Sequence, residues 1–263
     1  MTLVVLGDLM VDVVACTSGA LARGSDTPAA ISVRGGGSAA NVAAWAAWLG
    51  TPVALVCRVG DDERGRAAVA ELPGVDVHAV VDSEKPTGTC VVLVEPGGER
   101  TMLPDPGAND GPLPEIPLGD HLHVVGYALL RAGPRASALA AIERAQAAGM
   151  TVSVDPSSWA LLRADAIPPV DVLLPNVEEA ALLRDHPSRA IVTKLGADGA
   201  CWDDVRVPAE PVGVVDTTGA GDAFAAGFLT ARLGGAEPRE ALAAGCRVAA
   251  RAVAQVGARP EYD

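Results

Sequence analysis

The stretch DTTGAGDAF, from Asp216 to Phe224, joins two glycines to a carboxylate at the start of an apolar helical pattern. Gly219 and Gly221 let the backbone turn without a Cβ, so successive N–H groups can point into one concavity and bind an anion such as phosphate. Asp222 falls in the first helical turn and is ionised at pH 7, so beside a phosphate it is suited to take a proton from a nucleophile. The alternative is that Asp216 or Thr218 only caps the helix.

A second glycine-rich stretch, GGGSAANVA from Gly35 to Ala43, opens another helical pattern. Gly35, Gly37 and Ala40 fit the loose dinucleotide pattern G-x-G-x-x-[GA], which favours an NAD-dependent oxidoreductase. However, the stretch follows a weak strand. Alternatively, the small residues keep a pocket open in which the amide of Asn41 binds a hydroxylated ligand. A simple tight turn has the same pattern, and the residues leave the pocket and the tight turn equally open, whereas the dinucleotide signal is weak.

Several common site motifs are absent. Neither lysine of the chain, Lys85 or Lys194, follows a glycine, so there is no P-loop, and no G-x-S-x-G pattern occurs. His121 and His123 would share one face of a strand, but no third ligand is evident, so we interpret them as a solvated strand start rather than a metal pair.

Short runs rich in Val, Ile and Leu alternate with Ala-rich helical patterns, which is typical of parallel strands joined by crossover helices. The fold class is therefore α/β, with a mainly parallel central sheet between helices. The predicted strands span 2–6, 53–56, 122–125, 151–154, 170–174 and 190–193. The predicted helices span 38–49, 62–72, 134–148, 177–184, 220–233 and 238–256.

Two segments, at about 12–34 and 87–104, interrupt this alternation. In the second, the turn Pro96-Gly97-Gly98 between two apolar runs predicts a β-hairpin. The run AISVR in the first could supply a partner strand that buries Val92 and Val94. We expect a small β-sheet lid inserted in a single domain of residues 1–263, although an ordinary edge extension has the same pattern. An exposed edge of this lid could join two chains in a homodimer.

Charge and composition exclude several classes of protein. With 20 Lys+Arg against 33 Asp+Glu, the net charge of −13 disfavours nucleic acid and anionic membranes as partners. The five cysteines form no C-x-x-C pair, which argues against a disulfide framework or a structural zinc site. Single arginines such as Arg34, Arg66 and Arg100 are usually solvated in such a protein, so they do not indicate a phosphorylated acceptor. No signal or membrane-spanning pattern is evident, so we expect a soluble, cytoplasmic protein.

The run DTTGAGDAFAAGF, at 216–228, resembles the C-terminal signature of the ribokinase-like, or PfkB, carbohydrate kinase family. The Gly-Gly before Ser38, then Asn41 and Ala43, resembles the family's N-terminal signature. Further similar motifs are GDLMVD, GDDERG, GERT, GAN, PNVEEA and TKLGADGA, so the resemblance covers nearly the whole chain. It implies a three-layer α/β/α core with a small β lid and an ATP-dependent kinase acting on a small sugar or nucleoside.

The resemblance also implies roles for the residues around the transferred phosphate. Asp222 would be the catalytic base, and the amides of Gly219, Ala220 and Gly221 would form the anion hole. Asn176 and Glu179 would organise Mg²⁺ through water. The alternative for this N-x-x-E pair is a helix N-cap with its capping-box partner.

The acceptor and the nucleotide have implied contacts of their own. Asp12, Gly36 and Asn41 would bind acceptor hydroxyls, and Asp8 is either a further member of that group or a cap of the turn after the first strand. Thr193, Gly196 and Gly199 would face ATP, while Lys194 departs from the apolar residue usual there and receives no role. The carbonyl groups of Asp216 and Thr218, with the segment 253–257, would surround a monovalent cation such as K⁺.

The sequence thus predicts a phosphotransferase with an alcohol acceptor, using ATP and Mg²⁺. An NAD-dependent oxidoreductase and a non-catalytic sugar or nucleotide sensor on the same fold are the alternatives.

Overall fold

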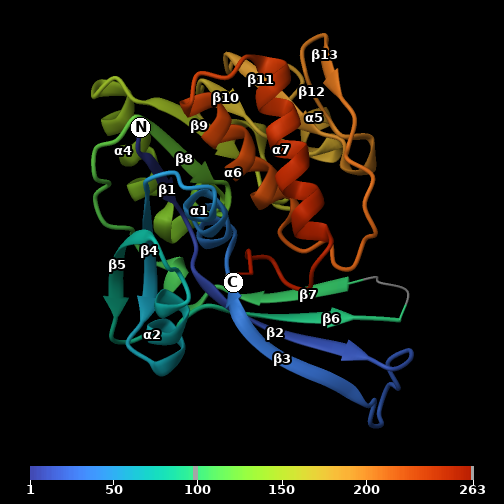
Figure 1. Ribbon diagram of the computed structural model, residues 1–263. Helices are drawn as coiled ribbons and strands as arrows, with labels where there is room; N and C mark the ends of the chain where they lie inside the picture. The colour runs from blue at the N-terminus through green and yellow to red at the C-terminus, as the bar shows by residue number, and fades with distance from the viewer. Residues whose placement is uncertain (97–99, 262–263) are drawn as a thin grey trace.

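One large, mostly parallel sheet forms the centre of the computed structural model, which describes residues 1–96 and 100–261 (Figure 1). Within these residues the strand order is β13-β12-β11-β10-β9-β8-β1-β4-β5, and the pairs β11/β12 and β12/β13 are antiparallel. The strands are β1 (Leu3–Leu6), β4 (Val53–Gly60), β5 (Val75–Asp82), β8 (His121–Val125), β9 (Thr151–Asp155), β10 (Val172–Leu173), β11 (Ala190–Lys194), β12 (Ala200–Trp202) and β13 (Val205–Val207). All six predicted strands are present, and β5, β12 and β13 were not predicted.

Helices cover both faces of this sheet, as Figure 1 shows. Side chains of β1 point alternately to the two faces of the sheet. Leu3 and Val5 pack with α1, α6 and α7 on one face, whereas Val4 and Leu6 pack with α4 on the other. The helices are α1 (Ser38–Trp48), α2 (Glu63–Ala70), α3 (Tyr127–Leu130), α4 (Ala132–Ala147), α5 (Val177–Leu182), α6 (Ala220–Leu233) and α7 (Pro238–Val253), with 3₁₀ turns at η1 (Gly107–Asp110), η2 (Ala164–Ala166) and η3 (Gly196–Asp198). The predicted α/β fold class is confirmed.

A smaller sheet of strand order β3-β2-β6-β7 extends away from the body (Figure 1). Its strands are β2 (Met10–Thr17), β3 (Ala29–Gly36), β6 (Thr89–Val94) and β7 (Arg100–Asp105). The predicted hairpin is present as the antiparallel pair β6/β7, whereas Gly97 and Gly98 of its predicted turn lie outside the described residues.

The prediction that AISVR pairs with this hairpin was wrong. AISVR lies in β3 and pairs with β2, and it is β2 that pairs with β6, in parallel. Because β2 occupies the middle of the sheet, Val92 is buried against Met10 and Cys90 rather than against AISVR. Strands β3 and β7 form the edges of the described sheet, and a homodimer through such an edge stays a prediction.

The two histidines at the start of β8 are buried, so the prediction of a solvated strand start was wrong. Strand β8 lies between β1 and β9, and both rings hydrogen-bond the Ser153 hydroxyl, at 2.7 Å from His121 Nε2 and 2.8 Å from His123 Nδ1. Burial lowers the pKa of each histidine to about 3, so both are neutral. No cluster of three metal-ligating side chains occurs in residues 1–96 and 100–261, and no described helix is long and apolar enough to cross a bilayer.

Candidate active site

Polar side chains gather where the parallel strands end. Asp8 follows β1, Tyr127 follows β8, Asp155 ends β9, Asn176 follows β10 and Lys194 ends β11. Because the carboxyl ends of parallel strands meet at one edge of the sheet, all five side chains line a single cavity of about 470 Å³. Residues of β2 and β7 line its other side, so the small sheet covers this edge.

Asp222 enters the same cavity from the first turn of α6. Its two carboxylate oxygens are held by the first turn of α1: Ser38 Oγ donates to Oδ1 over 2.6 Å, and Asn41 Nδ2 donates to Oδ2 over 2.9 Å. The pKa of Asp222 is raised to about 7, mainly by burial and also by nearby Asp155. The hydrogen bonds from Ser38 and Asn41 and the charge of Lys194 partly oppose this rise. A carboxylate with this pKa can accept a proton near neutral pH and release it again.

The amide groups before Asp222 form the start of α6. Gly219 has φ +73°, and a Cβ there would lie 2.6 Å from Ala258 Cβ, so a side chain would be strained and would collide. Gly219, Ala220 and Gly221 all line the cavity. No side chain caps α6, so the N–H groups of its first turn are open to an anion, although Ala220 N also bonds Thr217 O over 3.3 Å.

Asp216 and Thr218 bond each other instead of capping α6, so the capping alternative was wrong. Asp216 Oδ1 accepts hydrogen bonds from Thr218 N at 2.9 Å and from Thr218 Oγ1 at 2.6 Å, and Asp216 Oδ2 accepts from Gly257 N at 2.9 Å. Arg100, expected to be solvated, lines the cavity, donates to Thr218 Oγ1 over 2.8 Å and lies 3.6 Å from Asp216 Oδ1. The small sheet therefore contacts the start of α6 through a guanidinium group.

Two carbonyls of the segment 253–257, which was expected to help surround a monovalent cation, accept protein hydrogen bonds. Val253 O accepts from Val215 N at 2.7 Å and from Asp216 N at 3.2 Å. Val256 O accepts from Arg34 Nη1 at 3.1 Å, which places a fixed positive charge beside this segment. The Arg34 charge disfavours a second cation here, and a K⁺ site at the carbonyls of Asp216 and Thr218 stays a prediction.

Two of the three residues expected to bind the acceptor, Asp12 and Asn41, line the cavity. Asp12 is buried and lines it, and burial raises the pKa of its carboxyl to about 6, with Asp8 adding to the rise. Gly36 does not line the cavity; a Cβ there would lie 2.3 Å from the Asp12 carboxyl, so this glycine makes room for Asp12. Asp8 accepts hydrogen bonds from Ser38 N at 3.3 Å and from Ala39 N at 3.4 Å, and so interacts with the start of α1.

A second, mostly apolar cavity of about 580 Å³ adjoins the first. It is lined by Gly196 and Gly199, by the segment 209–214, and by Phe224 and Cys246 of α6 and α7. Thr193 lines neither cavity, whereas Lys194, the next residue, lines both. Two of the three residues expected on the nucleotide side therefore face this space.

Asn176 and Glu179 form the capping box of α5. Asn176 Oδ1 accepts from Glu179 N over 2.8 Å, and Glu179 Oε2 accepts from Asn176 N over 2.9 Å. Both residues also line the cavity, and Glu179 is 2% exposed with its pKa raised by burial and by Asp155. Glu179 Oε1 makes no hydrogen bond with a described residue, so the pair fits a Mg²⁺ held through water, which asks for few direct protein ligands.

Five side chains of this site were not predicted from the sequence, among them Asp155 at the end of β9. Ser38 was seen only as part of a glycine-rich loop, although a serine at a helix start is the available signal. Lys194 was given no role, and Tyr127 and Arg131 were not considered. Arg131 lines the cavity with its guanidinium 5.1 Å from the centre of the Tyr127 ring.

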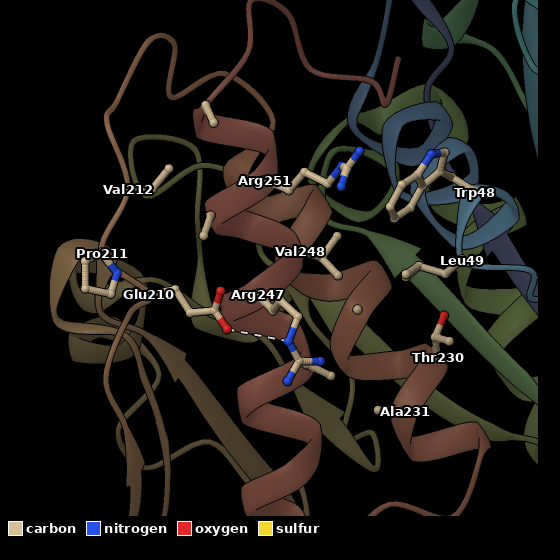
Figure 2. Close-up of a pocket in the computed structure, with 14 residues that line it drawn as sticks. Trp48, Leu49, Glu210, Pro211, Val212, Thr230, Ala231, Arg247, Val248 and Arg251 are labelled. Atoms are coloured by element: carbon tan, nitrogen blue, oxygen red, sulfur yellow. Dashed lines mark ion pairs between the residues drawn. The ribbon is translucent and has the colours of Figure 1, made fainter. Parts of the chain in front are cut away.

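A further pocket of about 460 Å³ lies among α1, α6, α7 and the segment 210–212, as Figure 2 shows. Glu210 and Arg247 form an ion pair across 3.5 Å at its margin, and the Arg251 guanidinium lies 4.6 Å from the centre of the Trp48 ring. It contains none of the polar residues described above and shares residues 210–212 with the apolar cavity.

The fold and site define an α/β enzyme with two adjoining cavities, an open helix start that borders both, and the Asp222 carboxylate in the first cavity. The whole chain, residues 1–263, matches the pfkB family carbohydrate kinases, and it belongs to that family. Its members are phosphotransferases that act on sugar hydroxyls.

Known relatives agree with this assignment. An ATP-dependent ribose-1-phosphate kinase from Halopiger xanaduensis is 37% identical over 79% of the chain and 76% of its own length. A fructokinase from Klebsiella pneumoniae is 34% identical over 86% of the chain and 82% of its own length. The structure of Arabidopsis thaliana ribokinase complexed with ribose and ATP has a TM-score of 0.78 at 25% identity, covering 97% of this chain and 93% of that one.

Proposed function

We propose that this chain transfers the γ-phosphate of ATP to a hydroxyl of a small sugar, with Asp222 as the general base. The observation that carries the proposal is the place of Asp222: its carboxylate is fixed by Ser38 and Asn41 in the cavity that the start of α6 borders. An acceptor hydroxyl bound beside Asp12 and Asn41 would lie between the base and the anion-binding amides.

The proposed step needs alignment and charge stabilisation more than covalent catalysis. The acceptor oxygen forms a bond to the γ-phosphorus as its proton passes to Asp222. The bond from that phosphorus to the bridging oxygen breaks, and its electron pair leaves with ADP. The amides of Gly219, Ala220 and Gly221 stabilise the charge on the transferred group.

ATP fits the adjoining apolar cavity. Phe224, Cys246 and Val253 supply an apolar surface for the base, and Gly196 lies where this cavity meets the acceptor cavity. When bound, Mg²⁺ would neutralise phosphate charge, with Asn176 and Glu179 holding its water ligands.

A phosphorylated or carboxylated sugar is a second candidate acceptor. Arg100 and Arg131 both line the acceptor cavity, and Arg131 makes no salt bridge with a described residue. A guanidinium group is suited to bind either kind of anion. The relative from Halopiger xanaduensis is named as a kinase of ribose 1-phosphate, which also favours a phosphorylated acceptor.

The oxidoreductase alternative is disfavoured at Gly35 to Ala40. At the start of α1, where a pyrophosphate would bind, Ser38 N and Ala39 N donate to the Asp8 carboxylate. A Cβ on Gly37 would lie 2.7 Å from Asp8 O, so this glycine serves close backbone packing instead of ligand approach. A buried carboxylate at this place would repel a dinucleotide phosphate.

The testing experiment is a panel of acceptors assayed for ADP formation with ATP and Mg²⁺. The panel contains ribose, fructose, 2-keto-3-deoxygluconate, adenosine and ribose 1-phosphate, with Asp222→Asn as the control. Turnover of one acceptor that is lost in the control supports the proposal. Absence of turnover on the whole panel would favour the sensor, and thermal stabilisation by NAD but not by ATP would favour the oxidoreductase.

A further inference from the structure

Lys194 lies where the two cavities meet. Five residues line both cavities, namely Lys194, Gly196, Thr217, Ala220 and Gly221, and Lys194 is the charged one among them. In a kinase with the acceptor on one side and the nucleotide on the other, the transferred group must cross this junction.

The Lys194 ammonium is charged and only partly used. Burial alone would lower its pKa, but Asp155, Glu179 and Asp222 outweigh that effect, so the pKa is raised and the group stays protonated. Among residues 1–96 and 100–261, Lys194 Nζ has one hydrogen-bond acceptor, Asp155 Oδ2 at 2.5 Å. An ammonium has three donors, so two are available to a ligand in the cavity, where the side chain is 15% exposed.

The ammonium also borders the anion-binding amides. A Cβ placed on Gly221 would lie 3.3 Å from Lys194 Nζ, so nothing but the glycine hydrogens separates the ammonium from the first turn of α6. An anion bound by the amides of that turn would therefore lie beside the lysine.

We propose that Lys194 is a catalytic residue that donates hydrogen bonds to the γ-phosphoryl group during transfer, and that Asp155 positions it. The inference rests on the proposed function. Lys194 keeps its protons throughout: the acceptor proton goes to Asp222, the bond from acceptor oxygen to phosphorus forms, and the electron pair of the broken bond goes to ADP. The lysine offsets negative charge on the phosphoryl oxygens, which the three nearby carboxylates would otherwise repel.

A purely structural ion pair between Lys194 and Asp155 would behave differently. Its loss would weaken folding or disturb all ligands alike. A contact with the γ-phosphoryl group predicts selective loss for ligands that carry that group.

The first test compares Lys194→Met with Lys85→Met, the exposed second lysine, in the presence of Mg²⁺. Isothermal titration calorimetry measures Kd for adenylyl imidodiphosphate, which has a γ-phosphoryl group, and for ADP, which has none. For Lys194→Met we expect the Kd for adenylyl imidodiphosphate to rise at least about 10-fold, which is the size of one charge-assisted hydrogen bond. The Kd for ADP should rise less than about 3-fold. Equal changes for both nucleotides, or no change, would overturn the proposal.

The second test needs no variant, which keeps the proposal falsifiable should Lys194→Met fail to fold. The unaltered protein is acylated with acetic anhydride and both lysines are followed by mass spectrometry. Adenylyl imidodiphosphate should slow acylation of Lys194 more than ADP does, with Lys85 unaffected. Equal protection of Lys194 by the two nucleotides would contradict the assignment.

The role of Asp155 is tested by a double-mutant cycle. Asp155→Asn should lower kcat in the unaltered background but cause no further loss in the Lys194→Met background, because it acts through the lysine. Additive losses would show that Asp155 acts separately. These binding and acylation results remain decisive even if no acceptor of the panel is phosphorylated, so the two proposals can fail independently.

Discussion

Asn41 Nδ2 donates a hydrogen bond to Asp222 Oδ2 over 2.9 Å. The residue expected to bind the acceptor therefore also holds the expected base. Arg259 Nε donates to Asn41 Oδ1 over 3.4 Å, so the orientation of the amide is fixed from its other end. In the proposed mechanism, this one side chain would link acceptor binding to proton transfer.

Asn41→Ala should consequently raise the acceptor KM and lower kcat. The lost hydrogen bond to a charged group is worth about 1.5–3 kcal/mol, or about 10- to 100-fold in kcat/KM. Steady-state kinetics with the acceptor varied at saturating ATP measures both constants. Ser38→Ala is the matched control, because Ser38 bonds the other oxygen of Asp222. If Asn41→Ala changed only the KM for ATP, the acceptor and nucleotide sides would have to be exchanged.

Asp222→Asn should keep nucleotide binding and lose turnover. The amide has nearly the shape of the carboxylate but cannot take the acceptor proton, so kcat should fall at least about 10²-fold. Calorimetry with ADP and Mg²⁺ should give a Kd within about 3-fold of the unaltered protein. Near-normal kcat on a true acceptor would show that Asp222 is not the base.

The activity should fall on the acid side with an apparent pKa near 7. Asp222 has its pKa raised to about 7, and a base works only when it is deprotonated. Activity is therefore present above that pH and is lost as the pH falls through it. The measurement is kcat/KM between pH 5 and 9 at constant ionic strength. An acid limb near pH 4, the ordinary range of an aspartate, would mean that the carboxylate is not desolvated as described.

Much of this fold could be predicted because local pattern and tertiary structure agree. The helix at 220–233 begins and ends as predicted, since glycines precede its apolar run and follow it. The apolar runs at 2–6 and 122–125 are strands because both faces of the central sheet are covered. The strands β12 and β13 were not predicted because each is only three residues long, which is too short to show an alternation of apolar and polar side chains.

The parts of the site that were missed depend on contacts between distant segments. Ser38 and Asp222 are 184 positions apart in the chain, and Lys194 and Asp155 are 39 apart. Spacing cannot show that β9 and β11 lie on either side of β10, so that Asp155 and Lys194 meet at their ends. The burial of His121 and His123 was missed for a similar reason, because a local pattern does not say that β8 is a central strand.

Catalysis should not need K⁺. Arg34 Nη1 donates to Val256 O, and Val253 O accepts from two backbone N–H groups, so two carbonyls of the segment already have partners and a fixed positive charge lies beside it. Replacing K⁺ by tetramethylammonium at constant ionic strength should change kcat less than about 2-fold, given saturating ATP and Mg²⁺. Arg34→Ala is the informative variant, since removal of the guanidinium would free that carbonyl. A large activation of the unaltered enzyme by K⁺ would refute this prediction.

The small sheet should close on the acceptor. Met10 of β2 and Arg100 and Met102 of β7 reach the cavity, so an occupied cavity would give these two strands a surface to pack against. Arg100 already donates a hydrogen bond to Thr218 at the start of α6, and this contact can hold the small sheet in its closed position. Closure would exclude water that could otherwise accept the phosphoryl group.

Hydrogen exchange followed by mass spectrometry tests this closure directly. Amides of β6 and β7 should gain protection when a true acceptor and adenylyl imidodiphosphate are both bound, whereas amides of β8 and β9, buried in the central sheet, should be unchanged. Arg100→Met should reduce the gain in β7, because the contact with Thr218 is lost while the strand pairing is kept. Protection of β6 and β7 that stays constant under saturating ligands would mean that the small sheet is a static wall of the cavity, because exchange at exposed strand edges reports their opening.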